Sequence, residues 1–374
     1  MNEHNSILVV FDQVRHFHLP LFEELERRMD ASGVELHLCR GEEAAGSARG
    51  SVGRAAVRLE TRYRLRDWRI KNYTFRLGLG YLSEVARLRP RVVICPAHPG
   101  NLGHWCLVLM KRVFDFKLVS WQCGYEYNPG RLKNFLVNRF VPAFDHHLAY
   151  HSNARRYCLA HGATENLVTV THNTIDERRI ERLPKAEARQ RIQEAHPVLR
   201  DRKIVLHVGA LLEEKRLECL IDAVLGLSRS DVALVIVGDG PHRTRLEEHA
   251  GGNPAVLFTG RIVEGVGTWF DAADMYVLPG TGGLGINEAM AHGLPILSSY
   301  ADGSADDLVV DGENGFRLRQ NTVEELQDRV SRVLDNPDLA AKMGANSRQW
   351  STGKFSFERF IDRIEGALVG VLGS

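Results

Sequence analysis

Strand-like and helix-like runs alternate along almost the whole chain, and this rhythm constrains the fold more than any other feature. SILVVFD at 6–12 precedes the amphipathic run LPLFEELERRM at 19–29, and VELHLC at 34–39 follows. Further strand-like runs in the same half are RVVICPA, FKLVSWQ, HLAYHS and LVTVTHN. Apolar strands separated by helices predict parallel sheets covered by helices. We therefore expect an α/β protein built of doubly wound, Rossmann-like domains.

A second alternating series begins with KIVLHVGA at 203–210, after a polar, helical stretch at 183–201. A chain of 374 residues is long enough for two domains of ordinary size. We predict an N-terminal domain at 1–177 and a C-terminal domain at 178–354. An amphipathic segment at 355–374 could pack on either domain, including back on the first. Such a pair forms a cleft between the carboxyl ends of both sheets, where ligands should bind.

The cysteines and the N-terminal sequence both indicate in which compartment the protein resides. The six cysteines are scattered without any C-x-x-C pair, and MNEHNSILVVFD has neither a basic start nor a long apolar core. We expect a cytoplasmic protein without a signal peptide or a membrane-spanning helix. The cysteines are Cys39, Cys95, Cys106, Cys123, Cys158 and Cys219.

The net charge of +1 hides an asymmetry between the two halves. Residues 1–180 carry 26 Lys and Arg against 18 Asp and Glu, whereas residues 181–374 carry 22 against 29. Much of the basic excess lies between Arg54 and Arg76, with Tyr63, Trp68 and Phe75 interleaved. This segment fits a solvated face, or a contact with an anionic membrane at the inner face of a cell membrane. No nucleic-acid-binding signature accompanies it, so nucleic acid ranks last.

The stretch MYVLPGTGGLGINEAMAHGLPILSS at 275–299 predicts a strand, a glycine-rich loop, a short helix and a second strand. Glycine lets an anion approach the main chain closely, and the free N–H groups of a helix's first turn point at it. A phosphate group suits such a loop. A plain tight turn, with Glu288 complementing the helix dipole, is the simpler alternative.

The same loop also matches a dinucleotide-binding fingerprint. Residues 280–285 read G-x-G-x-x-G, and Asp302 follows 17 residues after the last glycine. This pattern favours an NAD(P)-dependent oxidoreductase. Pro279, directly before the first glycine, is unusual for such a fingerprint.

Four segments of the second half occur in a characteristic order: VGALLEEKRLECLIDA at 208–223, VGDGPHRTRLEE at 237–248, LFTGRI at 257–262, and the glycine stretch. In order and spacing they resemble the nucleotide-sugar domain of GT-B glycosyltransferases of the retaining family 4 type. The resemblance is strong over residues 200–318 and fainter in the first half. It implies a hexosyltransferase with a nucleoside-diphosphate sugar as donor and no further cofactor.

The resemblance also assigns roles to individual residues. Lys215 would neutralise the diphosphate, and Glu288 would accept hydrogen bonds from the ribose hydroxyls. The loop residues Gly280, Gly282, Gly283, Leu284 and Gly285 would surround the distal phosphate and the sugar. The remaining donor-binding candidates are Gly209, Gly238, Asp239, Gly240, Arg261 and Ile262, of which the last five would flank the base.

Three departures from the family pattern stand out. Ala210 replaces a usual arginine, whose place could be taken by Arg216, by Arg15 or by nothing. Gly280, eight residues before Glu288, replaces the first acid of a Glu-x7-Glu pair, which normally addresses the sugar. Cys123 stands where an acceptor-side histidine is common. The acceptor-side candidates are Arg15, His16, His18, His98, His104 and Cys123.

Three functions thus fit the sequence: a retaining glycosyltransferase of a polysaccharide or glycolipid pathway, an NAD(P)-dependent oxidoreductase, and a catalytically silent family member. The first explains most of the motifs. The resemblance requires no metal, and His146, His147 and His151 lack the partner spacing of zinc ligands. The sugar, the base and the acceptor are not readable from the sequence.

Overall fold

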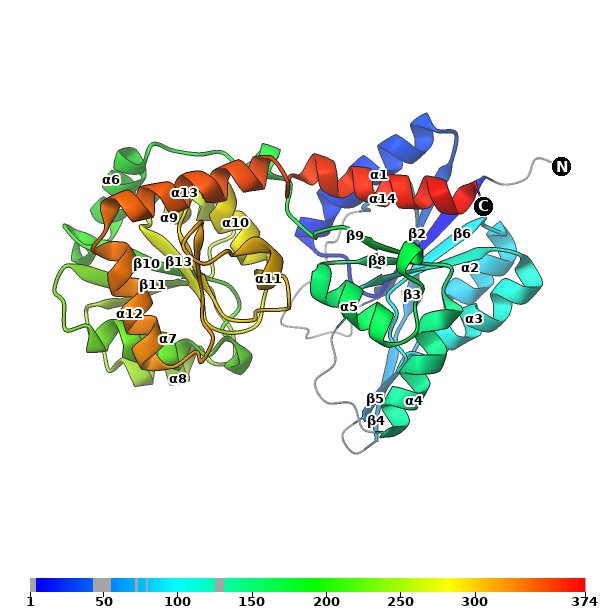
Figure 1. Cartoon of the computed structure of the whole chain (residues 1–374), viewed down its shortest axis with the longest axis horizontal. Coiled ribbons are helices and arrows are strands. Elements are labelled where there is room, and N and C mark those ends of the chain that lie inside the picture. The colour runs from blue at the N-terminus through cyan, green and yellow to red at the C-terminus, as the bar shows by residue number, and fades with distance from the viewer. Residues whose placement is uncertain (1–4, 43–54, 71–72, 79, 125–130, 374) are drawn as a thin grey trace. The chain divides into compact units, whose positions relative to one another are not determined.

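The structure is a computed structural model that describes residues 5–42, 55–70, 73–78, 80–124 and 131–373. The chain divides into two compact units (Figure 1). Unit 1 comprises Met1–Asn173 and Glu358–Ser374, and unit 2 comprises Thr174–Phe357.

Unit 1 is built on a parallel sheet of seven strands in the order β3-β2-β1-β6-β7-β8-β9. The strands are β1 (Ser6–Phe11), β2 (Glu35–Glu42), β3 (Leu59–Arg64), β6 (Val92–Cys95), β7 (Lys117–Gln122), β8 (His146–Ala149) and β9 (Val168–Val170). The helices are α1 (Leu19–Ala31), α2 (Gly80–Leu88), α3 (Leu102–Phe114), α4 (Arg131–Phe140), α5 (Ser152–Ala160) and α14 (Phe357–Leu372), of which Phe357 lies in unit 2. A separate antiparallel hairpin joins β4 (Arg66–Ile70) to β5 (Tyr73–Leu77). Short 3-10 turns are η1 (His16–His18), η2 (Val141–Ala143) and η3 (Glu165–Leu167).

Unit 2 contains a parallel sheet of six strands in the order β12-β11-β10-β13-β14-β15. The strands are β10 (Lys203–Val208), β11 (Val232–Val237), β12 (Val256–Gly260), β13 (Met275–Leu278), β14 (Ile296–Ser298) and β15 (Gly315–Arg317). The helices are α6 (Lys185–Ala195), α7 (Leu217–Gly226), α8 (Arg243–Ala250), α9 (Val266–Ala272), α10 (Leu284–His292), α11 (Ala305–Leu308), α12 (Val323–Leu334) and α13 (Pro337–Thr352). Its 3-10 turns are η4 (Glu177–Arg179), η5 (Pro197–Leu199) and η6 (Glu213–Lys215).

The sheet of unit 2 is buried on both faces because its central strands are apolar at nearly every position. Ile204 and Leu206 of β10 point into a core shared with α6, α9 and α10. Val205, between them, points into the opposite core with α7, α8 and α12. Successive side chains of a strand alternate between faces, so an unbroken apolar run fills both cores. The predicted doubly wound α/β architecture is confirmed in each unit.

The C-terminal helix α14 lies beside α1 in unit 1 (Figure 1). The guanidinium of Arg28, largely buried, forms ion pairs with Asp362 at 2.7 Å, with Glu365 at 2.8 Å and with Glu358. These carboxylates and Glu24 hold the pKa of Arg28 above its usual range, although burial acts against them. The chain thus returns to its first unit after completing the second.

Two further properties bear on the expected location of the protein. All six cysteines are free thiols. Within the described residues, no helix combines the length and the apolar character needed to cross a membrane.

Candidate functional site

The sheet of unit 2 changes its winding direction between β10 and β13. These strands are neighbours, and the helices that follow them, α7 and α10, lie on opposite faces of the sheet. Doubly wound sheets bind ligands in the crevice beyond the carboxyl ends of the strands at such a switch point. The loop after β10 contains Lys215, and the loop after β13 together with the first turn of α10 contains the four glycines, so the two strongest sequence motifs meet here.

Reciprocal hydrogen bonds join these two loops. The ammonium group of Lys215 donates to the carbonyl of Thr281. In return, the N–H of Thr281 donates to the carbonyl of Glu214 at 2.9 Å. Lys215 is therefore held directly over the glycine loop.

Two of the loop glycines leave room for this arrangement. A Cβ on Gly282 would lie 2.7 Å from the Lys215 Nζ, and the φ of Gly282 is +141°, which disfavours other residues. A Cβ on Gly280 would lie 2.1 Å from the Glu214 carbonyl oxygen and 2.4 Å from the Lys215 Cα. A side chain at either position would displace Lys215 or its backbone.

Glu288 lies on α10, one turn beyond Gly285, with a half-buried side chain. Burial raises the pKa of its carboxyl, although His292 acts in the opposite direction. Within the described part of the chain, no hydrogen bond to this carboxylate is found. A half-buried carboxylate without hydrogen bonds can accept two hydroxyl groups from a ligand.

Tyr276, on β13, packs against the start of α10. Its hydroxyl donates to the Val208 carbonyl at 3.4 Å, and a Cβ on Gly285 would lie 2.2 Å from that hydroxyl oxygen. Burial, followed by the charge of Glu288, raises the pKa of Tyr276. Gly285 thus lets the helix begin close to the strands.

The loops after β10, β11 and β12 form the other side of the candidate site. The N–H of Gly209 donates to the Val237 carbonyl at 3.0 Å, and that of Gly238 donates to the Gly260 carbonyl at 2.9 Å. A Cβ on Gly238 would lie 1.9 Å from the Gly209 carbonyl oxygen. These loops touch one another only because glycine occupies position 238.

The four remaining base-side candidates are distributed over two of these loops. Asp239 accepts from the N–H of Gly240 at 2.7 Å. Arg261 is exposed, whereas Ile262 is half-buried against the core. The structure places all of them on the same sheet edge as Lys215 and Glu288.

The missing arginine at 210 has no obvious replacement. Arg216, the neighbour of Lys215, donates to the Asn321 carbonyl at 3.2 Å. Arg15 belongs to unit 1, where it donates to the Gln13 side chain. Lys215 is thus the cation that directly contacts the glycine loop.

His207, on β10, was not identified from the sequence. It is completely buried, its Nδ1 lies 2.9 Å from the Val277 carbonyl, and its Nε2 has no hydrogen-bond partner within the described residues. Burial, together with the charge of Lys215, lowers its pKa to about 4, although the bond to Val277 acts in the opposite direction. The imidazole is therefore neutral beneath Gly209 and adds no second positive charge. Its only signal in the sequence is a polar residue inside an apolar strand.

The acceptor-side candidates all lie at the carboxyl ends of β1, β6 and β7 in unit 1. His16 and His98 are exposed, and Cys123 is half-buried. His104 is completely buried and hydrogen bonds to Asn101 at 3.3 Å.

His18 packs against Phe11 and receives a hydrogen bond from the Arg15 N–H at 3.1 Å. Burial, then the charges of Arg15 and His16, lower its pKa to about 3. Of the six candidates, His16 and His98 are the most exposed, whereas His104 is completely buried.

Residues 188–350 match the family described as glycosyl transferases group 1. The whole chain is similar in structure to Anabaena HepE solved with UDP, with a TM-score of 0.77, 17% identity, and coverage of 98% of this chain and 100% of that one. A sucrose-phosphate synthase from Thermosynechococcus elongatus gives a TM-score of 0.76 at 16% identity, covering 99% of each chain. The protein has the GT-B fold, and most of its second unit matches the group 1 glycosyl transferase family.

Curated relatives of this chain carry several different names. The sulfoquinovosyl transferase SQD2 of Arabidopsis thaliana is 27% identical over 76% of this chain and 57% of its own length. The alpha-D-kanosaminyltransferase of Streptomyces kanamyceticus is 32% identical over 45% of this chain and 46% of its own length. The match spans about half the length of these relatives. The resemblance to GT-B glycosyltransferases is thus confirmed, and the oxidoreductase alternative is not favoured.

The histidines at 146, 147 and 151 have structural partners in this GT-B protein. His147 bonds to the Ser120 hydroxyl at 2.7 Å, His146 to the Thr169 hydroxyl at 2.9 Å, and the His151 side chain accepts from the N–H of Ala154. Burial, then His146, lowers the pKa of His147 to about 4. No group of three or more His, Cys, Asp or Glu residues that could hold a metal occurs among the described residues.

The basic segment 54–76 lies only in part within the described residues. Arg58 pairs with Glu26 and Asp30, and Arg64 lies 3.4 Å from Glu42. Local carboxylates therefore partly neutralise this segment.

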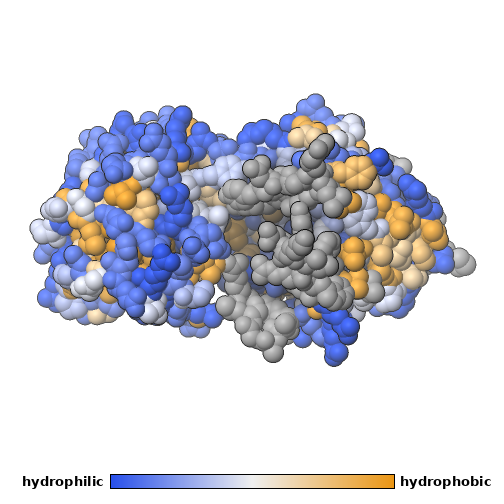
Figure 2. Space-filling view, turned by 90° about the horizontal axis from the view of Figure 1, so that it is seen from below, coloured by the Kyte–Doolittle hydropathy of each residue, from blue (hydrophilic) through white to orange (hydrophobic). Residues whose placement is uncertain are grey.

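Apolar residues reach the surface of unit 1 (Figure 2). Three of them, Leu102, Leu109 and Val113, are 47%, 64% and 77% exposed and share one face of α3 by their helical spacing. We call these three residues the α3 stripe. Arg112, also exposed, adjoins it.

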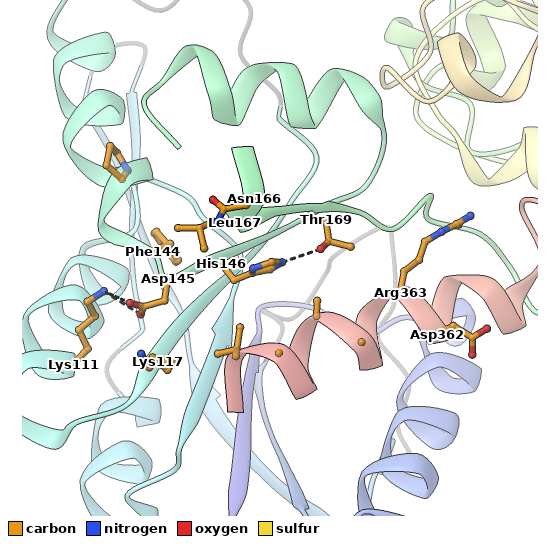
Figure 3. A pocket seen from close by; sticks show the side chains of 15 residues that line it. Lys111, Lys117, Phe144, Asp145, His146, Asn166, Leu167, Thr169, Asp362 and Arg363 are labelled. Atoms are coloured by element: carbon orange, nitrogen blue, oxygen red, sulfur yellow. Dashed lines mark hydrogen bonds and ion pairs between the residues drawn. The ribbon is translucent and has the colours of Figure 1, made fainter. Parts of the chain in front are cut away.

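A groove of about 850 Å³ lies at the amino ends of β7 and β8, between them and α14 (Figure 3). In one part of the groove the Lys111 Nζ lies 3.0 Å from the Asp145 Oδ2, and Arg363 lines another part. Ligands of doubly wound sheets bind at the opposite, carboxyl edge. We therefore assign no role to this groove.

Proposed function

We propose that the protein transfers a sugar from a nucleoside-diphosphate sugar to a glycan or lipid-linked acceptor, with retention of anomeric configuration. One observation carries the proposal. At the switch point of a group 1 domain, Lys215 is held over a glycine loop whose helix bears the half-buried carboxylate of Glu288. A cation, exposed main-chain N–H groups and a carboxylate suit a diphosphate followed by ribose.

The leaving diphosphate gains negative charge as the bond to the sugar breaks. Lys215 would exchange its bond to the Thr281 carbonyl for bonds to this diphosphate. The first N–H groups of α10 would add the positive end of the helix dipole. Positively charged groups placed in advance at a developing charge are an effective source of catalysis.

Glu288 would accept hydrogen bonds from the ribose hydroxyls. Because the ribose does not change during the reaction, this contact contributes equally to binding the donor and the transition state. The loops at Gly238–Gly240 and Arg261–Ile262 would flank the base. Solved relatives hold UDP and UDP-glucose, which supports a nucleotide-sugar donor.

The acceptor would enter from the carboxyl edge of unit 1, near His16, His98 and Cys123. Metal-independent transfer follows from the proposal, because Lys215 and main-chain N–H groups hold the diphosphate. If the acceptor is lipid-linked, the exposed α3 stripe and Arg112 would help hold the protein at the inner face of a membrane.

A thermal-shift panel of UDP, GDP, UDP-glucose, GDP-mannose and NADH tests the proposal. Ligand at about 100 times its Kd stabilises the folded protein by about 2.7 kcal/mol, which raises the Tm by several degrees. We expect at least one sugar nucleotide to stabilise wild type more strongly than Glu288→Gln at the same concentration. Stabilisation by NADH alone would instead favour the NAD(P)-dependent oxidoreductase. If a sugar nucleotide binds but a separate assay detects no sugar transfer, the protein would be a catalytically silent family member.

A further inference from the structure

Gly280 stands where the family resemblance expects an acid for the sugar, and the geometry explains why this position has no side chain. A Cβ at this position would come within 2.1 Å of the Glu214 carbonyl oxygen and 2.4 Å of the Lys215 carbonyl carbon. Both contacts are with backbone atoms, which cannot move aside as a flexible side chain can. The turn that places Lys215 over the loop therefore excludes an acid at 280.

A different carboxylate reaches the same loop from the next strand of the sheet. Asp302 follows β14, the neighbour of β13. A Cβ on Gly283 would lie 2.3 Å from the Asp302 Oδ2 and 2.9 Å from its Oδ1. The carboxylate thus contacts the backbone of Gly283, the residue before α10.

The orientation of Asp302 is fixed by its own loop. Its Oδ1 accepts from the N–H of Ser304 at 3.0 Å and from the hydroxyl of the same residue. Its Oδ2, the oxygen nearest Gly283, has no hydrogen bond within the described part of the chain. Ala301 has a φ of +56°, a conformation that residues other than glycine adopt uncommonly.

Groups of opposite charge thus lie beside two adjacent glycines. The Lys215 ammonium lies over Gly282 and the Asp302 carboxylate lies over Gly283. A sugar nucleotide has a matching pattern, with a doubly charged diphosphate next to a neutral ring rich in hydroxyl donors. A carboxylate repels the first part and accepts hydrogen bonds from the second.

We propose that Asp302 accepts hydrogen bonds from hydroxyl groups of the donor sugar and so takes the place of the acid that Gly280 cannot supply. Asp302 is then a specificity-determining residue of the donor site. This inference rests on the proposed function, because it requires a sugar nucleotide at the glycine loop.

The test compares nucleotides with and without the sugar. Calorimetric Kd values are measured for UDP, GDP, UDP-glucose and GDP-mannose with wild type, Asp302→Asn and Asp302→Ala, after melting curves confirm that the variants fold. We expect both variants to lose roughly tenfold or more in affinity for the preferred sugar nucleotide and to bind the matching diphosphate as wild type does. Ser304→Ala, which removes the hydroxyl bond to Asp302 but keeps the bond from the main-chain N–H, should give a smaller loss in the same direction.

Two results would overturn the inference. Equal losses for the diphosphate and the sugar nucleotide would mean that Asp302 only supports the loop. Tighter diphosphate binding by Asp302→Asn, with an equal gain for the sugar nucleotide, would mean that Asp302 only repels phosphate beside the helix N-terminus. If wild type binds none of the four probes, the proposed function fails first and this inference falls with it.

Discussion

Lys215 donates a hydrogen bond from its ammonium group to the main-chain carbonyl of Thr281, across the two loops that flank the switch point of the second sheet. The bond holds the cation over Gly282, whose missing side chain makes the approach possible. The predictions below follow from this arrangement and from its neighbours.

Lys215→Ala should lower kcat by roughly 10²-fold to 10³-fold, comparable to the loss of one oxyanion-hole donor. The effect should fall on turnover more than on donor Kd, because the diphosphate gains charge in the transition state. Arg216→Ala is the matched control, since its guanidinium already donates to the Asn321 carbonyl. A larger loss of turnover in Arg216→Ala than in Lys215→Ala would show that Arg216 replaces the missing arginine.

Glu288→Gln should raise the Tm of the ligand-free protein at pH 8. Burial raises the folded-state pKa of Glu288, so ionising this carboxyl destabilises the folded protein. That destabilisation develops as the pH rises above the usual glutamate pKa, and it is complete above the raised pKa. The difference in Tm between wild type and variant should therefore shrink as the pH is lowered toward about 4. A lower Tm for the variant at pH 8 would contradict this account.

We also expect the affinity for the donor to depend on pH, because the carboxylate of Glu288 can be protonated. Wild-type affinity should fall as the pH drops through the raised pKa of Glu288, because the protonated group loses acceptor capacity. Glu288→Gln should bind the donor roughly tenfold more weakly and should lack this step. Calorimetric titrations across the pH range measure both effects. The same pH step in the variant would assign it to another group.

Gly285→Ala should destabilise the protein by about 1–3 kcal/mol, because the new methyl group meets the Tyr276 hydroxyl. Tyr276→Phe removes that oxygen and should recover part of the loss in the double variant. Gly366→Ala on α14 is the matched control, since its Cβ would meet nothing within 4 Å. Additive losses in the double-mutant cycle would show that the two positions do not interact.

Sugar transfer should persist in excess EDTA, because Lys215 and main-chain N–H groups hold the diphosphate in the proposed site. The measurement is the initial rate with and without the chelator. Complete loss restored by Mg²⁺ or Mn²⁺ would reveal a metal-dependent enzyme.

Replacement of the α3 stripe at Leu109 and Val113 by serine should weaken sedimentation with anionic vesicles if the acceptor is lipid-linked. Each basic residue near such a surface contributes about 1 kcal/mol, so added salt should weaken binding further. Val369→Ser, at another exposed apolar position on α14, is the control. Equal sedimentation of all variants would leave the stripe without a role at membranes.

The architecture and the order of the motifs could be predicted from the sequence. Apolar strands such as 203–208 and 232–237 can only be buried on both faces, which requires parallel strands separated by helices. The glycines of 280–285 and the helix after them were recognisable because turn and helix signals are local. The roles of Lys215 and Glu288 followed from the resemblance to GT-B glycosyltransferases.

The contacts between residues distant in the sequence could not be predicted, because they depend on how the whole chain folds. Position 280 lacks an acid because the backbone of a segment some 65 residues earlier occupies its space, and no local pattern encodes that contact. The complete burial of His104, and the contact of His18 with Phe11, likewise depend on the folded chain. Asp302 is assigned to the sugar from its contact with Gly283, because the pairing of β13 with β14 brings the two loops together. Side-chain proximity across a sheet depends on strand order, which emerges only when the whole chain has folded.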